Sequence, residues 1–465
     1  MNIRLYKFAF VLGLAATLSS CGLYTKYERE TVIESNLYGE GVEVGSANGG
    51  VVNEGELLGN LSWREIFTDP ALQRLIESGL ENNRDLQKSV LSLEQAEATL
   101  RTKRLAFLPQ LSTAGGGYSV SYSKDLSGGY DTPVVSLNPS WVIDVFGSMR
   151  NDKMRQQMLS EQAESTVQAV HAQVVATIAN LYYTLQMLDA QIVITLATEV
   201  SWGESVRVSK SLMEAGLMNN TGVAQIEAGF FGVKSTLNEL KISRNEVQNS
   251  LCALLAIAPQ SIEVSPITPF ATPKAIQIGV PATALAMRPD VKSAEAALAA
   301  AFYSENMARS EFYPKFVFSY SGSMQVVDFI NPATWINTIA GMATMPIFNS
   351  GINRANLKIA KLNYEAARLD FEQALLNAGI EVNNALKSMD EYMGQGAIID
   401  KQLELLFVAA KNTMLLMEND SSVTYLDVLT ANQSLFNSQL TQVVNEYNQY
   451  TSLASLYTAL GGGRE

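Results

Sequence analysis

Residues able to carry out catalysis are scarce in this sequence. The 465 residues include one histidine, His171, and two cysteines, Cys21 and Cys252. A zinc site needs several His or Cys ligands, and a Ser-His-Asp triad has a single histidine to use. The run Ser121-Tyr122-Ser123-Lys124 matches the S-x-x-K pattern of β-lactamase-like enzymes, but it lies at a strand end without the companion motifs. We therefore predict no enzyme, no cofactor and no metal centre.

The composition further limits the classes of protein to which this chain can belong. The formal net charge is −13, and 47% of the residues are hydrophobic while only 17% are charged. Charged residues normally make up about a quarter of a soluble chain. An acidic chain lacks the basic surface that follows nucleic-acid phosphates, so we expect no nucleic-acid partner. Cys252 lies in an apolar helical run and is expected to be a small buried hydrophobe.

The N-terminal residues have the pattern of an export signal. Arg4 and Lys7 accompany an apolar run from Phe8 to Leu18, which is too short to span a bilayer as a helix. The following Leu18-Ser19-Ser20-Cys21 resembles a bacterial lipobox, whose cysteine thiol is acylated before cleavage. We predict a signal peptide over residues 1–20 and lipidation of Cys21. The alternative is an ordinary signal peptide with an incidental cysteine.

Proline placement divides the remaining chain into two similar parts. All thirteen prolines lie between Pro70 and Pro346, which leaves two Pro-free tracts of equal length, 140–258 and 347–465. Because proline breaks helix interiors, these tracts indicate two copies of a long-helix unit. Six prolines between residues 259 and 289 mark the linker that joins the copies.

Short matches between the two parts recur at a nearly constant offset. The matching pairs are Arg84-Asp85-Leu86 with Pro289-Asp290-Val291, Phe107-Leu108-Pro109 with Phe312-Tyr313-Pro314, Val145-Phe146 with Ile347-Phe348, and Leu212-Met213-Glu214 with Leu416-Met417-Glu418. Their offsets of 202 to 205 residues indicate a tandem duplication. The predicted division is a linker over 21–60, a first repeat over 61–259, a linker over 260–282 and a second repeat over 283–465.

Each repeat contains two segments with the alternation of β-strands. In the first repeat, apolar and polar positions alternate over 118–123 and again over 135–145. In the second repeat they alternate over 316–324, whereas the partner segment 335–348 alternates poorly. The turns are expected at 124–133 and 325–334. Alternation over about ten residues is typical of transmembrane strands, and soluble hairpins packed on helices are the alternative.

The Pro-free tracts predict very long helices. Gly147–Glu214 and Gly351–Glu418 would each extend about 100 Å at 1.5 Å per residue. Gly216 and Asn419 suit the left-handed conformation that ends a helix, and Thr221 suits an N-cap. Second helices are predicted over 223–258 and 426–460. A helical bundle or coiled-coil scaffold is the alternative.

The predicted topology bears on function. A sheet in hydrocarbon must close on itself, because unpaired backbone groups are too costly there. Four strands cannot close, since known barrels begin at about eight strands. Several chains must therefore pool their strands, and the long helices continue from the barrel on one side. The predicted fold class is mixed but mainly α, and such an assembly is a conduit.

The sequence closely resembles the TolC-like outer membrane factors of tripartite efflux systems, in their NodT/OprM-like lipoprotein branch. The stretches that carry the resemblance are 63–72, 288–291, Ala294-Glu295, 346–351, 381–386, 425–431 and 459–463. The resemblance implies a homotrimer, with an outer-membrane β-barrel that continues into an α-helical periplasmic tunnel. It further implies a periplasmic adaptor protein and an inner-membrane RND-type pump as partners, and contact with outer membrane lipid.

The resemblance also implies a gate. The family's Leu-Asp-Val-Leu-Asp-Ala pattern matches Leu426-Asp427-Val428-Leu429-Thr430-Ala431, so Asp427 keeps one acidic position and Thr430 replaces the other. Three copies of Asp427 would form a carboxylate ring that attracts cations. Asp427 also suits a helix N-terminus, and the two roles can coexist. The hairpin tips expected to contact the adaptor contain Gly216, Leu217, Asn219, Thr221, Asn419, Asp420 and Ser421.

Three functions follow as hypotheses. The leading one is a passive outer-membrane duct for small molecules such as drugs and toxic compounds, lipid-anchored and membrane-spanning with a periplasmic helical domain. The second is the outer-membrane duct of a type I protein secretion system, which shares the fold. The third is a periplasmic helical lipoprotein scaffold without a channel.

Overall fold

The computed structural model describes residues 27–28, 62–122, 129–270, 282–325, 336–344, 349–419 and 425–463. The chain divides into two compact units. The first unit comprises residues 1–32, 92–164 and 293–372, and it includes every described strand. The second unit comprises residues 33–91, 165–292 and 373–465.

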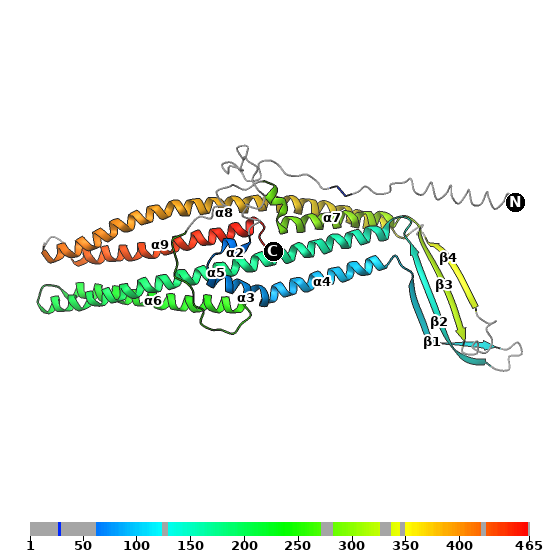
Figure 1. The fold of residues 1–465 in the computed structure, drawn as a ribbon, viewed down its shortest axis with the longest axis horizontal. Helices are drawn as coiled ribbons and strands as arrows, with labels where there is room; N and C mark the ends of the chain where they lie inside the picture. Colours follow the sequence, from blue (N-terminus) through cyan, green and yellow to red (C-terminus); the bar gives the residue numbers. More distant parts are fainter. Residues whose placement is uncertain are drawn as a thin grey trace. The chain divides into compact units, whose positions relative to one another are not determined.

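From α4 in the first half and from α7 in the second, the two halves of the chain contain the same elements in the same order (Figure 1). The first half contains α2 (Trp63–Ile66), α3 (Pro70–Asn82), α4 (Arg84–Leu105), β1 (Gln110–Tyr122), β2 (Gly129–Ile143), α5 (Ser148–Glu214) and α6 (Asn220–Leu254). The second contains the 3₁₀ helix η4 (Ala282–Met287), α7 (Pro289–Ser310), β3 (Lys315–Gln325), β4 (Ile336–Thr344), α8 (Ile352–Asn419) and α9 (Tyr425–Ala459). Corresponding helices match in length: α4 and α7 have 22 residues each, α5 has 67 and α8 has 68, and α6 and α9 have 35 each.

Both long helices begin one residue after a glycine with positive φ. Gly147 has φ 75° before α5, and Gly351 has φ 80° before α8. At α5 the carboxylate of Asp144 accepts the backbone N–H groups of Met149 (3.1 Å) and Arg150 (2.9 Å). The first N–H groups of a helix have no partner inside it, and a carboxylate there also suits the helix dipole.

The helices α6 and α9 end in the same kind of turn. After α9, Gly461 has φ 77° and the N–H of Gly462 donates to the carbonyl of Tyr457 (3.1 Å). After α6, Ala256 has φ 55° and the N–H of Ile257 donates to the carbonyl of Cys252 (3.0 Å). This left-handed turn favours glycine. Ala256 therefore adopts a backbone conformation that is unfavourable for an alanine.

The four strands form an antiparallel sheet in the order β1-β2-β3-β4 (Figure 1). Trp141 of β2 pairs with Phe318 of β3, and Ile143 pairs with Phe316. Directly paired residues share a face of the sheet. The predicted apolar faces of β2 and β3 therefore coincide. Because Phe318 in turn pairs with Gly341, the register also assigns the faces of β4, which alternation alone left open.

The strand boundaries correct two predictions. β1 begins at Gln110 and not near Tyr118. The prediction placed its start too late because the glycines around a register shift between Gly115 and Gly117 interrupt the alternation of apolar and polar residues. β2 begins at Gly129, so the second half of the turn predicted over 124–133 belongs to the strand. A β-bulge bends a strand and changes which residues face each side.

The first unit is held together beside its sheet by aromatic and ionic contacts. The ring of Phe146 stacks on those of Tyr313 and Phe316, with centroids 4.9 and 6.3 Å away. Asp152 of α5 pairs with Lys103 (2.7 Å) and Arg155 (2.8 Å). Burial alone would raise the pKa of Asp152, but the hydrogen bonds from both cations outweigh it and lower the pKa.

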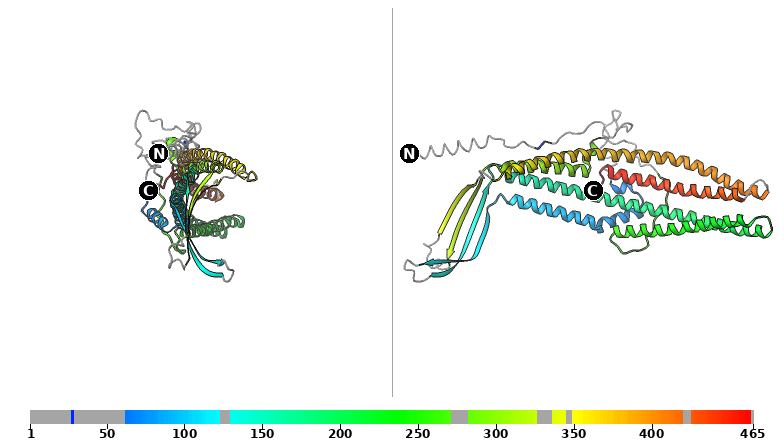
Figure 2. Two further views of the ribbon diagram at one scale, coloured as in Figure 1. Left: turned by 90° about the vertical axis from the view of Figure 1, so that its right-hand side faces the viewer. Right: turned by 180° about the vertical axis from the view of Figure 1, so that it is seen from behind.

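The second unit contains two antiparallel helical hairpins, α5 with α6 and α8 with α9 (Figures 1 and 2). Its core includes the fully buried rings of Trp63, Phe67, Tyr182 and Tyr457. Cys252 is 1% exposed, which confirms that it is a small buried hydrophobe. No helix in the described ranges is both long enough and apolar enough to cross a membrane.

Candidate functional site

The first hairpin turns at Gly216, the residue predicted to adopt the left-handed conformation at the end of the helix. α5 ends at Glu214, Gly216 has φ 73°, and the N–H of Leu217 donates to the carbonyl of Leu212 (2.8 Å). This confirms the left-handed residue that ends the helix. Leu217 is 77% exposed, so the tip presents an apolar side chain to its surroundings.

The N-cap of α6 is Asn219, and the prediction of Thr221 as the cap is wrong. The side chain of Asn219 accepts the N–H of Gly222 at 2.8 Å. Thr221 lies inside the first turn of α6 and is exposed. Asn is as good an N-cap as Thr, so either residue could have been predicted as the cap. With Asn219 as the cap, the helix begins two residues earlier than a cap at Thr221 would require.

The end of the second hairpin is described in part. α8 includes Asn419, so the helix extends one residue beyond its predicted end at Glu418. Asp420 and Ser421 lie outside the described residues, as does the predicted lipidation site Cys21. α9 then begins at Tyr425.

The two predicted gate residues lie at the start of α9. Asp427 is exposed in the first turn, where the helix dipole favours a carboxylate. Thr430 is also exposed, and its hydroxyl donates to the carbonyl of Leu426 one turn earlier (2.8 Å). Val428 between them is 5% exposed, so the apolar side of this turn packs on the hairpin. The side chains of Asp427 and Thr430 are thus both exposed at the start of α9.

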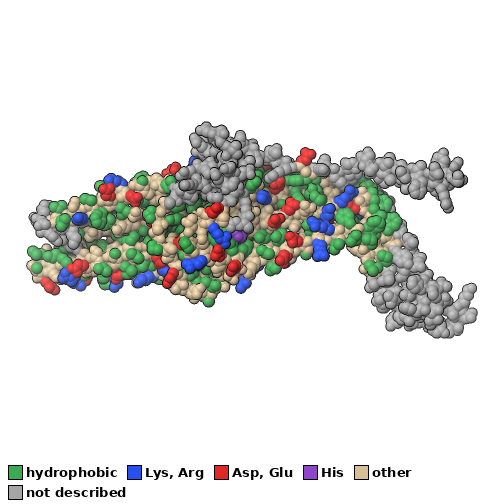
Figure 3. Space-filling model, viewed as in Figure 1, with side chains coloured by type: hydrophobic (Ala, Val, Ile, Leu, Met, Phe, Trp, Pro, Cys, Tyr) green, Lys and Arg blue, Asp and Glu red, His purple; other side chains and the backbone are tan. Residues whose placement is uncertain are grey.

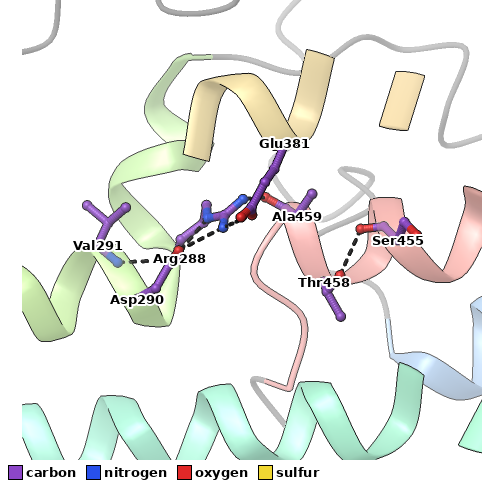
Figure 4. Close-up of polar contacts among 7 residues, drawn as sticks. All are labelled: Arg288, Asp290, Val291, Glu381, Ser455, Thr458 and Ala459. Carbon is purple, nitrogen blue, oxygen red and sulfur yellow. Dashed lines mark hydrogen bonds and ion pairs between the residues drawn. The ribbon is translucent and has the colours of Figure 1, made fainter. Parts of the chain in front are cut away.

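A buried arginine joins three stretches that carry the family resemblance (Figure 4). Arg288 donates to the carboxylates of Asp290 (2.7 Å) and Glu381 (2.5 Å) and to the carbonyl of Ala459 (2.6 Å). Its side chain is 5% exposed, while those of Asp290 and Glu381 are 46% and 56% exposed. These stretches were recognisable in the sequence, but the contact between them was not.

The electrostatics of this arginine favour its charged form. Burial alone would lower the pKa of Arg288, but the hydrogen bonds to Asp290 and Glu381 outweigh burial and raise the pKa. A planar guanidinium can donate to two carboxylates and a carbonyl at once, which an ammonium group does less well. We name these four residues, Arg288, Asp290, Glu381 and Ala459, the arginine clamp.

A second polar cluster links the N-terminal helices to α5. The hydroxyl of Tyr182 donates to the carboxylate of Asp69 (2.5 Å), which also caps α3 by accepting the N–H of Ala71 (2.8 Å). The N–H of Ser265 donates to the same tyrosine hydroxyl (3.1 Å). Burial and the hydrogen bond to Asp69 raise the pKa of Tyr182. The hydroxyl of Ser265 also donates to Asp69 (3.3 Å), and the cluster fixes α3 against α5.

Groups of metal-ligating side chains were searched for in the described part of the chain. There, no three His, Cys, Asp or Glu side chains gather closely enough to hold a metal ion. The described residues form a framework of helices and strands, with Leu217 exposed at the end of the first hairpin and Asp427 exposed at the start of α9.

Comparisons with known proteins agree on one family. The model of the family described as "Outer membrane efflux protein" matches residues 75–256 and 280–462. "Cation efflux system protein CusC" of Escherichia coli is 28% identical, with 97% of each chain covered. "Solvent efflux pump outer membrane protein SrpC" of Pseudomonas putida is 30% identical, with 86% of this chain and 87% of that protein covered.

A crystal structure of CusC superimposes with a TM-score of 0.81 at 26% identity, covering 95% of this chain and 100% of that one. The sequence match thus spans both halves, and the fold match includes nearly the whole chain. The protein therefore belongs to the outer membrane efflux protein family and is an outer-membrane channel component of an efflux system.

Proposed function

We propose that three copies of this chain close their sheets into one barrel and conduct small molecules through a helical tunnel. Among the described strands, β1 and β4 are each paired on one side only. Three four-stranded sheets joined at these edges give about twelve strands, within the range of closed barrels. Closure pairs the edge groups, as hydrocarbon requires.

The observation that supports association between copies of the chain is an exposed apolar stripe on α8; the number three follows from the family resemblance. Its residues recur with the three- and four-residue spacing of a heptad and are 50% to 59% exposed; they are Ile352, Ile359, Leu362, Leu369, Leu376 and Ile380. The opposite side of α8, including Phe371 and Ala378, is already buried within the chain. A heptad stripe on an exposed face is the pattern that packs against another helix. Hydrophobic side chains are also visible on the hairpin surfaces in Figure 3.

The partners and cargo follow from the same architecture. The hairpin ends, with Gly216, Leu217, Asn219, Thr221 and Asn419, are the surface proposed to meet a periplasmic adaptor and, through it, an RND-type pump. The proposed cargo is small molecules, since CusC and SrpC are named for cation and solvent efflux. That two similar proteins differ in cargo supports a duct whose substrates are selected by its pump.

The trimer is tested by native mass spectrometry of the detergent-extracted protein. Wild type should be a trimer, and the double variant Leu362→Glu, Leu369→Glu should dissociate because three stripes would then each carry two charges at the contact. Lys361→Glu, at an exposed position beside the stripe, should remain trimeric. A wild-type monomer, or a trimeric double variant, would contradict the stripe as the interface.

The gate is proposed at Asp427, with Thr430 in the position of the second acid. Like charges brought close raise the cost of ionising all of them, so closure rests on packing while the ring supplies cation preference. Single-channel recordings should show lower cation selectivity and weaker divalent block for Asp427→Ala. Asp370→Ala, which removes an exposed acid about a quarter of the way along α8 and far from its hairpin end, should change neither. Unchanged selectivity in Asp427→Ala trimers would place the constriction elsewhere.

The anchor is proposed at Cys21 on the strength of the lipobox. Mass spectrometry of the mature N-terminus should detect the acyl chains. Cys21→Ala should lose them while the barrel still assembles, because the strands and not the lipid cross the membrane. An unmodified wild-type N-terminus would refute the lipoprotein assignment.

A further inference from the structure

Two helix ends of the first unit are basic where they approach the sheet, although the chain as a whole has a net charge of −13. The end of α4 (98–105) and the start of α8 (352–364) each contain three basic residues and no acidic one. These residues are Arg101, Lys103 and Arg104 on α4 and Arg354, Lys358 and Lys361 on α8. Figure 3 shows Lys and Arg side chains on the helices close to the sheet.

Most of these cations have no ionic partner within the chain. Lys103 pairs with Asp152 (2.7 Å), which also binds Arg155 (2.8 Å). The other five side chains are exposed and form no ion pair among the described residues; they are Arg101, Arg104, Arg354, Lys358 and Lys361. We name these five residues the basic collar. Their charge is available to an anion from outside the chain.

On both helices the cations lie beside an exposed apolar face. Arg104 comes one position before Leu105, which is 54% exposed. Lys358 comes one position before Ile359, a residue of the apolar stripe on α8 that is 55% exposed. One position is a rotation of about 100° on an α-helix. The apolar faces can therefore pack on a neighbouring chain while the cations stay exposed beside the contact.

The two parts of the basic collar come together only between chains. α4 leads into β1 and α8 follows β4, and these are the two edge strands of the sheet. When such edges join, the end of α4 from one chain lies beside the start of α8 from the next. The two helices run in opposite directions, so residues one position before the apolar contact lie on the same side of the pair. The five cations of each junction then face the same way and repel each other.

Aromatic side chains occupy the same end of the sheet. Trp141 of β2 is 43% exposed, and its Nε1–H donates to the carbonyl of Phe107 (2.9 Å), three residues after Arg104. The Nζ of Lys153 lies 6.0 Å from the centroid of the Phe107 ring. Exposed tryptophan beside lysine and arginine is typical of the boundary between a membrane and water, where lipid headgroups lie.

We propose that the basic collar binds the phosphate of an anionic phospholipid at each junction between two chains. The phosphate accepts hydrogen bonds from cations of both chains and offsets their mutual repulsion. The lipid thereby stabilises the assembled trimer. The inference rests on the trimer proposed above, and it adds a ligand whose site no single chain completes.

Native mass spectrometry of the detergent-extracted trimer with added dioleoylphosphatidylglycerol tests the lipid. The trimer should retain this lipid and dissociate at a higher temperature than without it. Dioleoylphosphatidylcholine, whose phosphate charge is balanced by choline, and inorganic phosphate should have neither effect. A trimer that retains no phosphatidylglycerol, or that responds equally to phosphatidylcholine or inorganic phosphate, would overturn the proposal and leave the trimer standing. A wild-type monomer would overturn the trimer and the lipid site together.

Variants locate the site. Arg104→Gln combined with Lys358→Gln removes one cation from each side of the junction and should weaken phosphatidylglycerol retention about tenfold or more. Without lipid, the same variant trimer should dissociate at a higher temperature than wild type, because repulsion across the junction is reduced. The control, Lys387→Gln combined with Lys411→Gln, removes two exposed lysines farther along α8 that form no ion pair among the described residues, and it should match wild type in both measurements.

Two results would refute the location. One is lipid retention by the Arg104→Gln, Lys358→Gln trimer that equals that of wild type. The other is a changed ion selectivity of this variant in single-channel recordings with unchanged lipid retention, since the cations would then line the conduit and not its outer surface.

Discussion

Replacing Arg288 by methionine removes the whole arginine clamp while keeping a long apolar side chain. The carbonyl of Ala459, a residue that is 4% exposed, loses its donor, and leaving a buried acceptor unpaired costs about 1–3 kcal/mol. Asp290 and Glu381 lose their cation but are about half exposed, so water replaces much of that interaction. We expect a total near the lower end of the roughly 3–5 kcal/mol typical of breaking a buried ion pair. Arg288→Lys, which keeps the charge but not the planar fork, should fall between.

The matched control is Arg368→Met on α8. Arg368 also binds two carboxylates, Glu365 and Glu372, each at 2.6 Å, but all three residues lie on one helix and are partly exposed. Exposed pairs of this kind within one helix contribute little to stability. Thermal unfolding in detergent, followed by far-ultraviolet circular dichroism, should therefore show a clear fall in Tm for Arg288→Met and little change for Arg368→Met. Equal shifts would refute the argument that burial makes the clamp strong.

Three further predictions use the same assay. Gly229→Ala places a Cβ 1.9 Å from the Trp202 ring and should lower the free energy of unfolding by about 1–3 kcal/mol. Its control is Gly232→Ala, where a Cβ would meet no atom within 4 Å; this change should raise the free energy of unfolding by about 0.5–1 kcal/mol. Equal effects of the two variants would contradict the close packing of Gly229 against Trp202. Ala256→Gly should stabilise by about 0.5–1 kcal/mol because it relieves a left-handed alanine, and a loss of stability would show that the turn is unstrained. The folded-state pKa of Asp152 is below 3.8, so its contribution is present above pH 3.8 and lost as pH falls through the folded value. Asp152→Asn should thus lower Tm at neutral pH and match wild type at strongly acidic pH; a constant difference would count against the ion pairs.

The helices and most strands could be predicted because their signals are local. The absence of proline over two tracts set the long helices to within a few residues, and Gly216 ended its helix as expected. Alternation revealed the apolar faces of β2 and β3. It failed for the start of β1, where glycines carry no pattern, and for β4, whose faces follow only from its pairing with β3.

The polar clusters could not be predicted because their partners are far apart in sequence. Arg288 contacts residues 93 and 171 positions away, and no local pattern specifies such pairs. The hydrogen bond from Gln442 of α9 to Asp400 of α8 likewise depends on the register of the two helices. Thr221 shows the limit even of local signals: two neighbouring residues suited the cap, and the geometry of the turn selected Asn219.

The two hairpins have nearly equal lengths, and this equality sets how far each one extends. With 67 and 68 residues in the long arms and 35 in each short arm, the hairpins reach the same number of helical turns from their starting glycines. Removing seven residues from both arms of one hairpin shortens it by about 10 Å, at 1.5 Å per residue, and leaves its end out of level with the other. Changes in reach must therefore be made in both repeats together, which ties the lengths of two separate stretches of the gene to each other.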